Sequence, residues 1–196
     1  MSKKEVLVEI SARHIHVTKE HLEVLFGPGA TLTPVKELSQ PNQYACAERV
    51  NVEGPKGTLK NVIILGPTRP ETQLEVSLTE ARQLGIKALV RMSGAIEGTN
   101  GCKIIGPKGE VDLEKGVIAA KRHIHFSDDE AKEYDVSDNE VVLVKVTSDD
   151  RSLIFDDVVI RVNKNFKAAM HIDTDEANAA GLTQSVMGEI IKKTIG

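Results

Sequence analysis

Four of the six histidines in this sequence belong to one motif that occurs twice. Arg13-His14-Ile15-His16 recurs without change as Arg122-His123-Ile124-His125. Side chains alternate along an extended chain, so the two histidines of each motif project from one face while the isoleucine points to the other. Two imidazoles at this spacing can chelate one divalent metal ion such as zinc. The repeated motif therefore predicts two metal sites.

A third candidate ligand follows each motif further along the chain. Glu75 and His171 open two related stretches that end at Gly85 and Gly181. The predicted ligand sets are His14, His16 and Glu75 in one copy, and His123, His125 and His171 in the other. Both compositions are typical of metal sites that keep open positions for water or substrate, which favours catalysis over structural closure. The alternative is that Glu75 is a surface carboxylate and His171 a core histidine.

In the first copy only, an arginine lies six residues before the third ligand. Arg69 lies in a turn-rich stretch, Gly66-Pro67-Thr68-Arg69-Pro70-Glu71-Thr72-Gln73, whose two prolines stiffen the chain. An arginine held there, six residues before Glu75, can offer a bidentate hydrogen bond to phosphate or carboxylate. The aligned residue of the second copy is Asn165. Anion binding is one interpretation, and a solvated arginine is the other.

These residues need a scaffold, and the repeat predicts its organisation. A further block recurs between the histidine motif and the third ligand: Val50-x-Val52 with Leu59 matches Val144-x-Val146 with Leu153. The three blocks keep their order, at offsets of 109, 94 and 96 positions. Offsets that change only by loop-sized steps indicate two copies of one folding unit. The chain is predicted to be a tandem duplication.

Strands are predicted to dominate both copies. Alternating and β-branched residues indicate strands over 6–10, 49–52, 59–65, 89–92, 141–146 and 153–162. Two Gly-Pro-Lys-Gly turns, at 54–57 and 106–109, are predicted to join hairpins. Because strands and helices do not alternate in βαβ fashion, the pattern favours a mainly β fold with short capping helices. We expect two tandem small β-barrels related by internal duplication.

Helices are predicted to be few and short. Thr18 and Ser127 would cap helices that begin directly after the two histidine motifs, and Ser127 would open a capping box. Two more helices are predicted over 79–85 and 175–181, each ending at a glycine. His21 lies on the first helix and has no counterpart in the second copy, so we expect it at the surface.

The composition excludes several classes of protein. The 196 residues carry 25 basic and 29 acidic side chains, spread along the chain, and few aromatic residues, so nucleic acid is not an expected partner. The longest apolar runs, such as Val62-Ile63-Ile64-Leu65, are far shorter than the roughly 20 residues of a membrane-spanning helix. Cys46 and Cys102 form no C-x-x-C pair and are expected to be buried or inert thiols.

Four stretches carry a resemblance to a known family: S-x-R-H-I-H-V, G-P-x-R-P-x-T-Q-x-E-V-S, K-R-H-I-H-F and M-H-I-D-T-D-E-A-N-A. They resemble the motifs of the PduL-type phosphate acyltransferases, from about Val6 to Leu182. The resemblance implies two small β-barrels capped by short helices, with a dinuclear metal site, usually zinc, between them. It also implies an enzyme that exchanges phosphate and coenzyme A on a short acyl group, commonly propanoyl or acetyl.

The resemblance further implies a role for particular residues. The six candidate ligands would hold two zinc ions per chain, and Arg69 would bind phosphate as a catalytic residue. The implied contacts with coenzyme A are Ile10, Ser11, Ala12, Lys56 and Asn178. In the family the opening strand packs into the second barrel. The expected domains are therefore residues 13–121, and residues 122–196 completed by the strand within 1–12.

The implied chemistry agrees with the residues. Acyl transfer from a thioester to phosphate develops negative charge on oxygen and then on sulfur, which a pair of metal ions can stabilise. The motifs hold no Ser-His-Asp or Cys-His nucleophile arrangement, so we expect direct attack by phosphate.

A location is implied as well. Family members inside bacterial microcompartments carry an N-terminal extension, whereas only five residues precede Val6 here, and the N-terminus leads into no apolar signal segment. We therefore expect a free cytoplasmic enzyme of acetate or propanoate metabolism rather than a shell-associated one, with a homodimer as one option. Its partners would be small-molecule substrates, without a membrane.

Two other functions fit part of the pattern. Glu20 and Glu130 follow the histidine motifs at about the spacing of cupin metal ligands, which would suggest a double-cupin oxygenase or isomerase. A non-catalytic metal-storage or scaffold module would bind metal without turnover.

Overall fold

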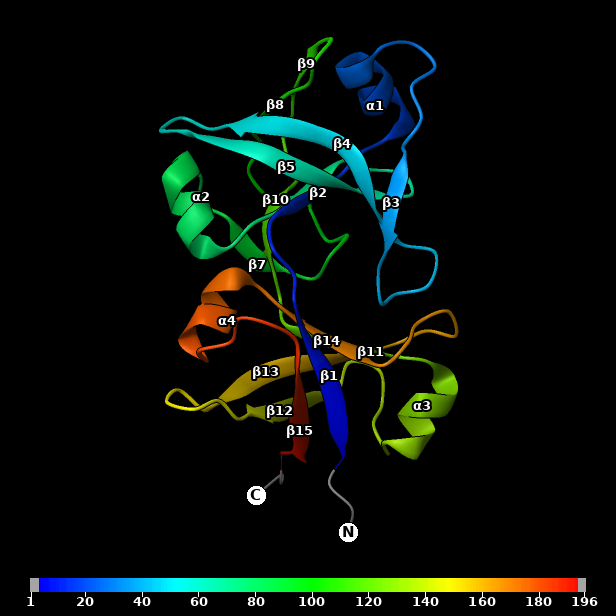
Figure 1. The fold of residues 1–196 in the computed structure, drawn as a ribbon, viewed down its shortest axis with the longest axis vertical. Helices are drawn as coiled ribbons and strands as arrows, with labels where there is room; N and C mark the ends of the chain where they lie inside the picture. Colours follow the sequence, from blue (N-terminus) through cyan, green and yellow to red (C-terminus); the bar gives the residue numbers. More distant parts are fainter. Residues whose placement is uncertain (1–3, 194–196) are drawn as a thin grey trace. The chain divides into compact units, whose positions relative to one another are not determined.

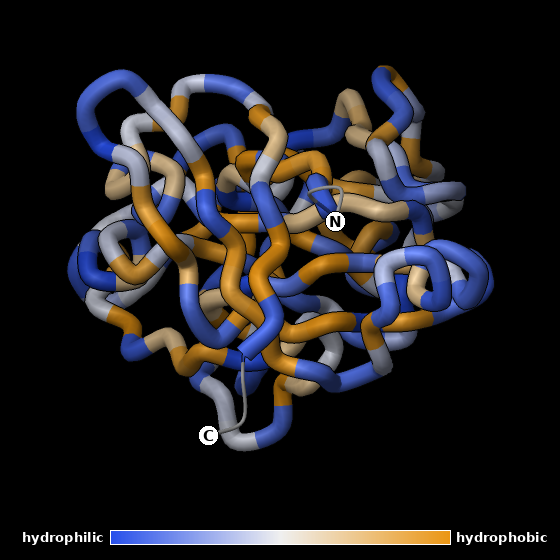
Figure 2. The backbone as a smooth tube through the Cα atoms, turned by 90° about the horizontal axis from the view of Figure 1, so that it is seen from below, coloured by the Kyte–Doolittle hydropathy of each residue, from blue (hydrophilic) through white to orange (hydrophobic). Residues whose placement is uncertain are grey.

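The computed structural model describes residues 4–193 as two compact units (Figure 1). The first-motif unit comprises residues 12–38 and 42–120 and contains the motif of His14. The second-motif unit contains the motif of His123 and comprises residues 4–11, 39–41 and 121–193 of the described chain. Figure 2 shows apolar residues concentrated along the strands and polar residues in most of the turns, as expected where strands enclose a core.

The second-motif unit is a closed six-stranded barrel. In ladder order its strands are β1 (Glu5–Ile10), β14 (Ala169–Ile172), β11 (His123–Phe126), β13 (Leu153–Val162), β12 (Val141–Val146) and β15 (Val186–Lys192). Its core includes Val8, Phe126 and Met170, all fully buried. The prediction of a mainly β fold is confirmed, and this unit has the predicted closed barrel.

The first-motif unit is built on a nine-stranded sheet. Its ladder order is β7 (Leu89–Arg91), β10 (Val117–Ala120), β6 (Gln73–Glu75), β2 (His14–His16), β5 (Thr58–Gly66), β4 (Tyr44–Glu53), β8 (Lys103–Ile105) and β9 (Glu110–Asp112), with β3 (Pro34–Glu37) beside β4. Ile15, Ile64 and Leu74 lie in its core.

Each strand that carries a candidate ligand leads directly into a short helix. The helices are α1 (Lys19–Phe26), α2 (Leu78–Leu84), α3 (Asp128–Glu133) and α4 (Thr174–Ala179). Thr18 caps α1 and Ser127 opens the predicted capping box of α3. The predicted starts of α2 and α4 were one residue late, because Ser77 and Asp173 form the capping boxes. No helix in residues 4–193 is long and apolar enough to cross a membrane.

Aligned residues of the two copies occupy matching ladder positions. His14 pairs with Glu75 on the antiparallel side of β2, and His123 pairs with His171 on the antiparallel side of β11. On the other side, both histidine strands pair in parallel with the longer strands β5 and β13. This shared register is compatible with an internal duplication.

The strand before each histidine motif pairs in the unit of the other motif. β1 precedes His14 but pairs in parallel with β14, where Glu9 lies opposite His171. β10 precedes His123 but pairs in parallel with β6, where Ile118 lies opposite Glu75. Positions 9 and 118 are therefore equivalent in the two ladders.

The two Gly-Pro-Lys-Gly turns join hairpins as predicted and also close helix ends. Lys56 donates its backbone N–H to the Leu84 carbonyl at the end of α2, at 2.9 Å, and Lys108 does the same to Leu25 at the end of α1, at 3.0 Å. A Cβ atom on Gly54 would lie 2.3 Å from the Leu84 oxygen. The close approach requires glycine there, and the turn satisfies a carbonyl that the helix leaves open.

Candidate metal centres

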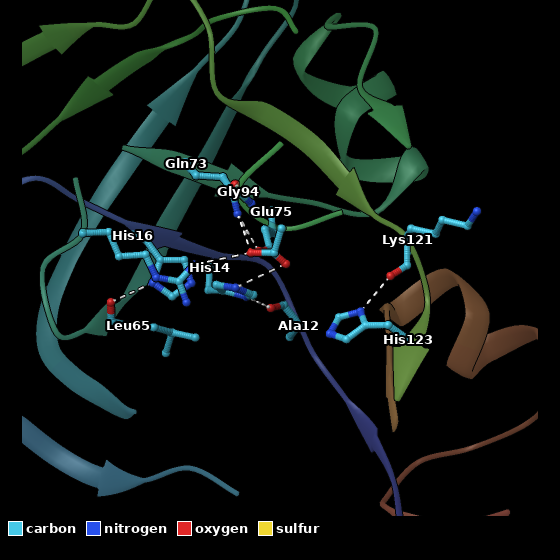
Figure 3. A network of polar contacts seen from close by, with 11 residues as sticks. Ala12, His14, His16, Leu65, Gln73, Glu75, Gly94, Lys121 and His123 are labelled. Carbon is cyan, nitrogen blue, oxygen red and sulfur yellow. Dashed lines mark hydrogen bonds and ion pairs between the residues drawn. The ribbon is translucent and has the colours of Figure 1, made fainter. Parts of the chain in front are cut away.

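The first triad combines His14 and His16 of β2 with Glu75 of β6 (Figure 3). One ligand atom from each lies within 4.8 Å of the others, and His14 Nε2 is 3.5 Å from Glu75 Oε2. Ile15 points into the core, so alternation sends both histidines to the opposite face as predicted. Glu75 is 9% exposed, which rules out the alternative of a surface carboxylate.

Backbone carbonyls fix the tautomers of both histidines. His14 Nδ1 is 2.9 Å from the Ala12 oxygen, and His16 Nδ1 is 3.1 Å from the Leu65 oxygen (Figure 3). A neutral imidazole that donates from Nδ1 keeps its lone pair on Nε2. Such outer hydrogen bonds orient histidine ligands in metal sites. The donor set and its orientation therefore fit a divalent ion.

The charges in this triad are strongly coupled. Burial, together with the neighbouring His14 and Arg69, lowers the pKa of His16 to about 3, so this imidazole is neutral at pH 7. Burial acts most strongly and would lower the pKa of His14, but the charge and hydrogen bond of Glu75 and the Ala12 carbonyl together outweigh burial and leave that pKa raised. Burial would raise the pKa of Glu75, whereas the charge and hydrogen bond of His14 bring it below its ordinary value. The carboxylate is thus charged.

Two donors orient the Glu75 carboxylate. Gln73 Nε2 and Ser93 Oγ both donate to Glu75 Oε1, at 2.6 and 2.8 Å. Gln73 Oε1 in turn accepts the Gly94 backbone N–H at 2.7 Å (Figure 3). With Oε1 occupied, Oε2 is the oxygen turned to His14. The sequence reasoning missed both donors, although Gln73 could have been found by alternation, two residues before Glu75 on one strand.

Arg69 is linked to the Glu75 carboxylate through the hydroxyl of Ser93. Its Nη1 donates to Ser93 Oγ at 3.3 Å, and its backbone N–H donates to the Val17 carbonyl at 2.9 Å. The same serine hydroxyl donates to Glu75. A guanidinium is thereby held beside the first triad.

His21 was expected at the surface, and the structure bears this out only in part. The residue lies on α1 as predicted but is only partly exposed, because its Nδ1 is 2.7 Å from Thr72 Oγ1. The same hydroxyl accepts the Thr18 backbone N–H, so His21 helps to tie the start of α1 to the Arg69 loop.

The second triad combines His123 and His125 of β11 with His171 of β14. Their ligand atoms again lie within 4.8 Å of one another. His123 Nδ1 is 2.8 Å from the Lys121 carbonyl, which repeats the contact of His14 (Figure 3). The His125 ring packs edge-on against Phe166, with centroids 4.3 Å apart. The contact of His171 is different, because its Nε2 is 3.1 Å from Glu9 Oε2.

The arginine of each histidine motif forms an ion pair with a helix cap. Arg13 Nη1 is 2.8 Å from Glu80 Oε1, and Arg122 Nε is 2.7 Å from Glu176 Oε1. Both glutamates are the capping-box residues of the helices that follow the third ligands. Each arginine thus ties the start of a histidine strand to the helix that follows the third ligand of the same triad, which is a structural role.

The residues implied for coenzyme A lie at several places. Ile10 ends β1, and the Ser11 N–H donates to the Ile172 carbonyl. Ala12 is exposed, and its carbonyl accepts from His14. The other two side chains are also exposed, one in the turn between β4 and β5 and one on α4: Lys56 and Asn178.

The alternative cupin ligands and the cysteines do not take part in the two triads. Glu130 accepts the Ser127 N–H and the Ala168 N–H, while Glu20 is exposed in the first turn of α1, so neither joins a triad as a cupin ligand would. Cys46 and Cys102 are buried free thiols as predicted. Burial raises their pKa values to about 11 and about 12, so both are protonated at neutral pH.

The fold and the triads define a β-barrel protein with two candidate metal centres, and comparison with known proteins agrees with an enzyme. Residues 7–183 match the sequence profile of phosphate propanoyltransferases. Among curated relatives, a phosphate propanoyltransferase of Clostridioides difficile strain 630 is 53% identical, covering 97% of this chain and 92% of the relative. One of Leptotrichia buccalis is 56% identical, covering 95% and 88%. One of Thermotoga maritima is 54% identical, covering 95% and 89%.

This chain belongs to the phosphate propanoyltransferase family. The resemblance to phosphate acyltransferases is confirmed, and the protein is an acyltransferase. Membership of this family does not support the double-cupin and metal-storage alternatives.

Proposed function

We propose that this enzyme transfers a short acyl group, propanoyl or acetyl, between coenzyme A and inorganic phosphate, with the triads holding the two zinc ions of a dinuclear site. The proposal rests on one observation above all: a chain of this family has two largely buried ligand triads whose histidines are oriented by outer hydrogen bonds. Zinc bound there would supply Lewis-acid stabilisation of a carbonyl oxygen and of a leaving thiolate.

Arg69 is the proposed phosphate-binding residue. The prolines of its loop, the backbone bond to Val17 and the side-chain bond to Ser93 restrict where the guanidinium can go. A planar guanidinium donates two parallel hydrogen bonds to phosphate oxygens. Arg69 would hold hydrogen phosphate with a third oxygen directed at the thioester carbonyl carbon, which turns an encounter of two anions into an oriented attack.

The proposed reaction needs no acyl-enzyme. A phosphate oxygen forms the new C–O bond, the C–S bond breaks, and its electron pair leaves on sulfur. The proton of hydrogen phosphate ends on the coenzyme A thiol, and the other product is the acyl phosphate. The protonated, buried state of both cysteines supports direct attack, since neither thiol is a ready nucleophile at neutral pH.

Coenzyme A is proposed to bind along Ile10, Ser11 and Ala12, with Lys56 and Asn178 as further contacts. The backbone bond from Ser11 to Ile172 holds the first segment in place. Lys56 is an exposed cation of the kind that binds phosphate groups, which coenzyme A carries.

Phosphate-dependent thiol release from propanoyl-CoA tests the proposal. We expect release by the wild type and a loss of about 100-fold or more in kcat/KM for Arg69→Ala, because the anion loses its oriented donor. Arg91→Ala is the matched control, since Arg91 is an exposed arginine of β7. No release by the wild type, equal loss in both variants, or a covalent acyl-protein detected by mass spectrometry without phosphate would contradict it.

Several finer expectations stay predictions. They are the choice between propanoyl and acetyl groups, a cytoplasmic location apart from a microcompartment shell, a homodimer, and a role in acetate or propanoate metabolism. Comparing kcat/KM for propanoyl-CoA and acetyl-CoA would decide the first.

A further inference from the structure

The two triads differ in the residue that lies opposite the third ligand on the neighbouring strand. In the second-motif unit Glu9 lies opposite His171, whereas in the first-motif unit the equivalent position is Ile118, opposite Glu75. Facing residues of neighbouring strands project to the same side of the sheet, so each is placed to touch its partner. A carboxylate therefore stands beside the histidine ligand, and an apolar residue beside the carboxylate ligand.

Glu9 contacts His171 directly. Glu9 Oε2 is 3.1 Å from His171 Nε2, and Ser39 Oγ donates to the same oxygen. The two side chains are largely screened, with 26% of Glu9 and 20% of His171 exposed. Glu9 is thus held from one side by a hydroxyl and lies against the imidazole on the other.

The serine is itself fixed by its neighbour. Gln40 is 3% exposed, donates to the Lys167 carbonyl at 2.9 Å and accepts the Lys167 N–H at 3.3 Å. This paired contact seats residues 39–41 on the loop before β14, within the second-motif unit. Phe166, next to Lys167, packs on His125. The loop before β14 therefore supports His125 directly, and it supports His171 through residues 39–41 and Glu9.

A carboxylate in this position supplies what the second triad lacks. Three neutral imidazoles bring no negative charge to a dication, whereas Glu75 brings one to the first triad. A carboxylate that accepts the Nε2 proton of a histidine leaves the lone pair on Nδ1, increases the basicity of the ring and places negative charge one bond away from the ion.

We propose that Glu9, held by Ser39, is a positioning residue of the second centre that sets the tautomer of His171 and provides the charge that its three histidines do not. The inference rests on the zinc binding of the proposed function. It predicts that removing Glu9 weakens one zinc site and leaves the other unchanged.

Zinc affinity measured in single-centre proteins tests this. His14→Ala with His16→Ala keeps only the second triad, and His123→Ala with His125→Ala keeps only the first. We expect Glu9→Ala to weaken zinc binding about 10–100-fold in the former protein and not in the latter, as read by competition with a chromophoric chelator. Glu9→Gln keeps an acceptor but loses the charge, so its effect should be smaller.

Two readouts separate positioning from general damage. The visible spectrum of Co2+ in the second-triad protein should change with Glu9→Ala, because ligand orientation changes. Glu5→Ala, on the exposed part of the same strand, should leave affinity and spectrum as they were. If a single-centre protein does not fold, biphasic zinc release from the full chain replaces it, and Glu9→Ala should speed one phase only.

The failures are distinguishable. This inference alone is overturned if the wild type binds two zinc ions and Glu9→Ala changes the zinc affinity of neither site, or of both sites equally. A wild type that binds no zinc overturns it together with the metal centre of the proposed function.

Discussion

The two triads place their negative charge at different depths. In the first-motif unit the carboxylate of Glu75 is itself a candidate ligand, and two neutral donors hold it. In the second-motif unit the carboxylate is Glu9, one contact behind His171. The same ladder thus brings one negative charge to each triad in two different ways. Where the ligand is charged, its ladder neighbour is the apolar Ile118, and where the ligand is neutral, its neighbour is an acid.

The surroundings of the second histidine in each motif, His16 and His125, differ as well. Gln73 pairs with His16 on the ladder, while Ala169 pairs with His125 and Phe166 covers that ring. In the first-motif unit the Gln73 amide donates to the Glu75 carboxylate and to Ser93, and Arg69 also donates to Ser93. The difference shows that the two units keep the same arrangement of candidate ligands while the residues around those ligands differ.

Deleting the third ligand of each triad should give the largest effect. Glu75→Ala and His171→Ala should each lower zinc from two ions per chain to one and reduce turnover about 100-fold or more, measured by elemental analysis and thiol release. Only Glu75→Ala leaves two donors without their buried acceptor. It should therefore also lower the free energy of unfolding of the zinc-free protein by about 1–3 kcal/mol, a cost that the more exposed His171 avoids.

The control is Glu71→Ala, an exposed glutamate of the loop before β6. Equal losses of stability in Glu75→Ala and His171→Ala, or unchanged zinc content, would contradict the contrast between the triads.

The cysteines report on one unit only, since both lie in the first-motif unit. Burial raises the pKa values of Cys46 and Cys102 to about 11 and about 12, so a thiol reagent at pH 8 should label neither in the native protein and both in urea. Above pH 9 the unfolded thiols lose protons that the folded thiols keep. The free energy of unfolding should thus fall as pH rises from 9 towards 11.

Denaturant titrations at pH 8 and pH 10.5 measure this slope. Cys46→Ala with Cys102→Ala should show a shallower fall over the same interval. An identical slope in the variant, or rapid labelling of the native protein, would show that the thiols are more accessible than their burial indicates.

The arginines of the two motifs should give the smallest effect. Arg13 and Arg122 form equivalent ion pairs with Glu80 and Glu176, but the arginine side chains are 41% and 33% exposed. Solvent screens such pairs, so alanine at either position should lower the free energy of unfolding by about 0.5–1 kcal/mol. Equal, small losses in urea titrations would support equivalent roles, while a loss of several kcal/mol in one variant alone would break the equivalence.

The elements predicted best are those rich in β-branched and other apolar residues. The predicted strands 141–146 and 153–162 agree with β12 and β13 residue for residue, because most of their residues are of these types. β3 was missed, since all four of its residues are exposed and show no buried face. The predicted starts of α2 and α4 were one residue late because a helix cap depends on hydrogen bonds as well as on residue type.

The candidate ligands could be predicted from residue type, spacing and repetition, whereas the outer contacts of the second triad could not. Alternation within three residues decides that His14 and His16 share a face, so local geometry was enough. Glu9, Ser39 and His171 are far apart in the chain, and no spacing relates them. Their contact arises because β1 pairs with β14 in one particular register and because Gln40 seats its segment on the loop before β14.

For this protein, then, the order of residues alone determined which side chains are candidate metal ligands, since chemistry and short-range periodicity belong to the chain itself. Tertiary structure decided which acid stands behind which ligand. Strand register is set by packing of the whole barrel, and a shift of one residue would turn Glu9 away from His171.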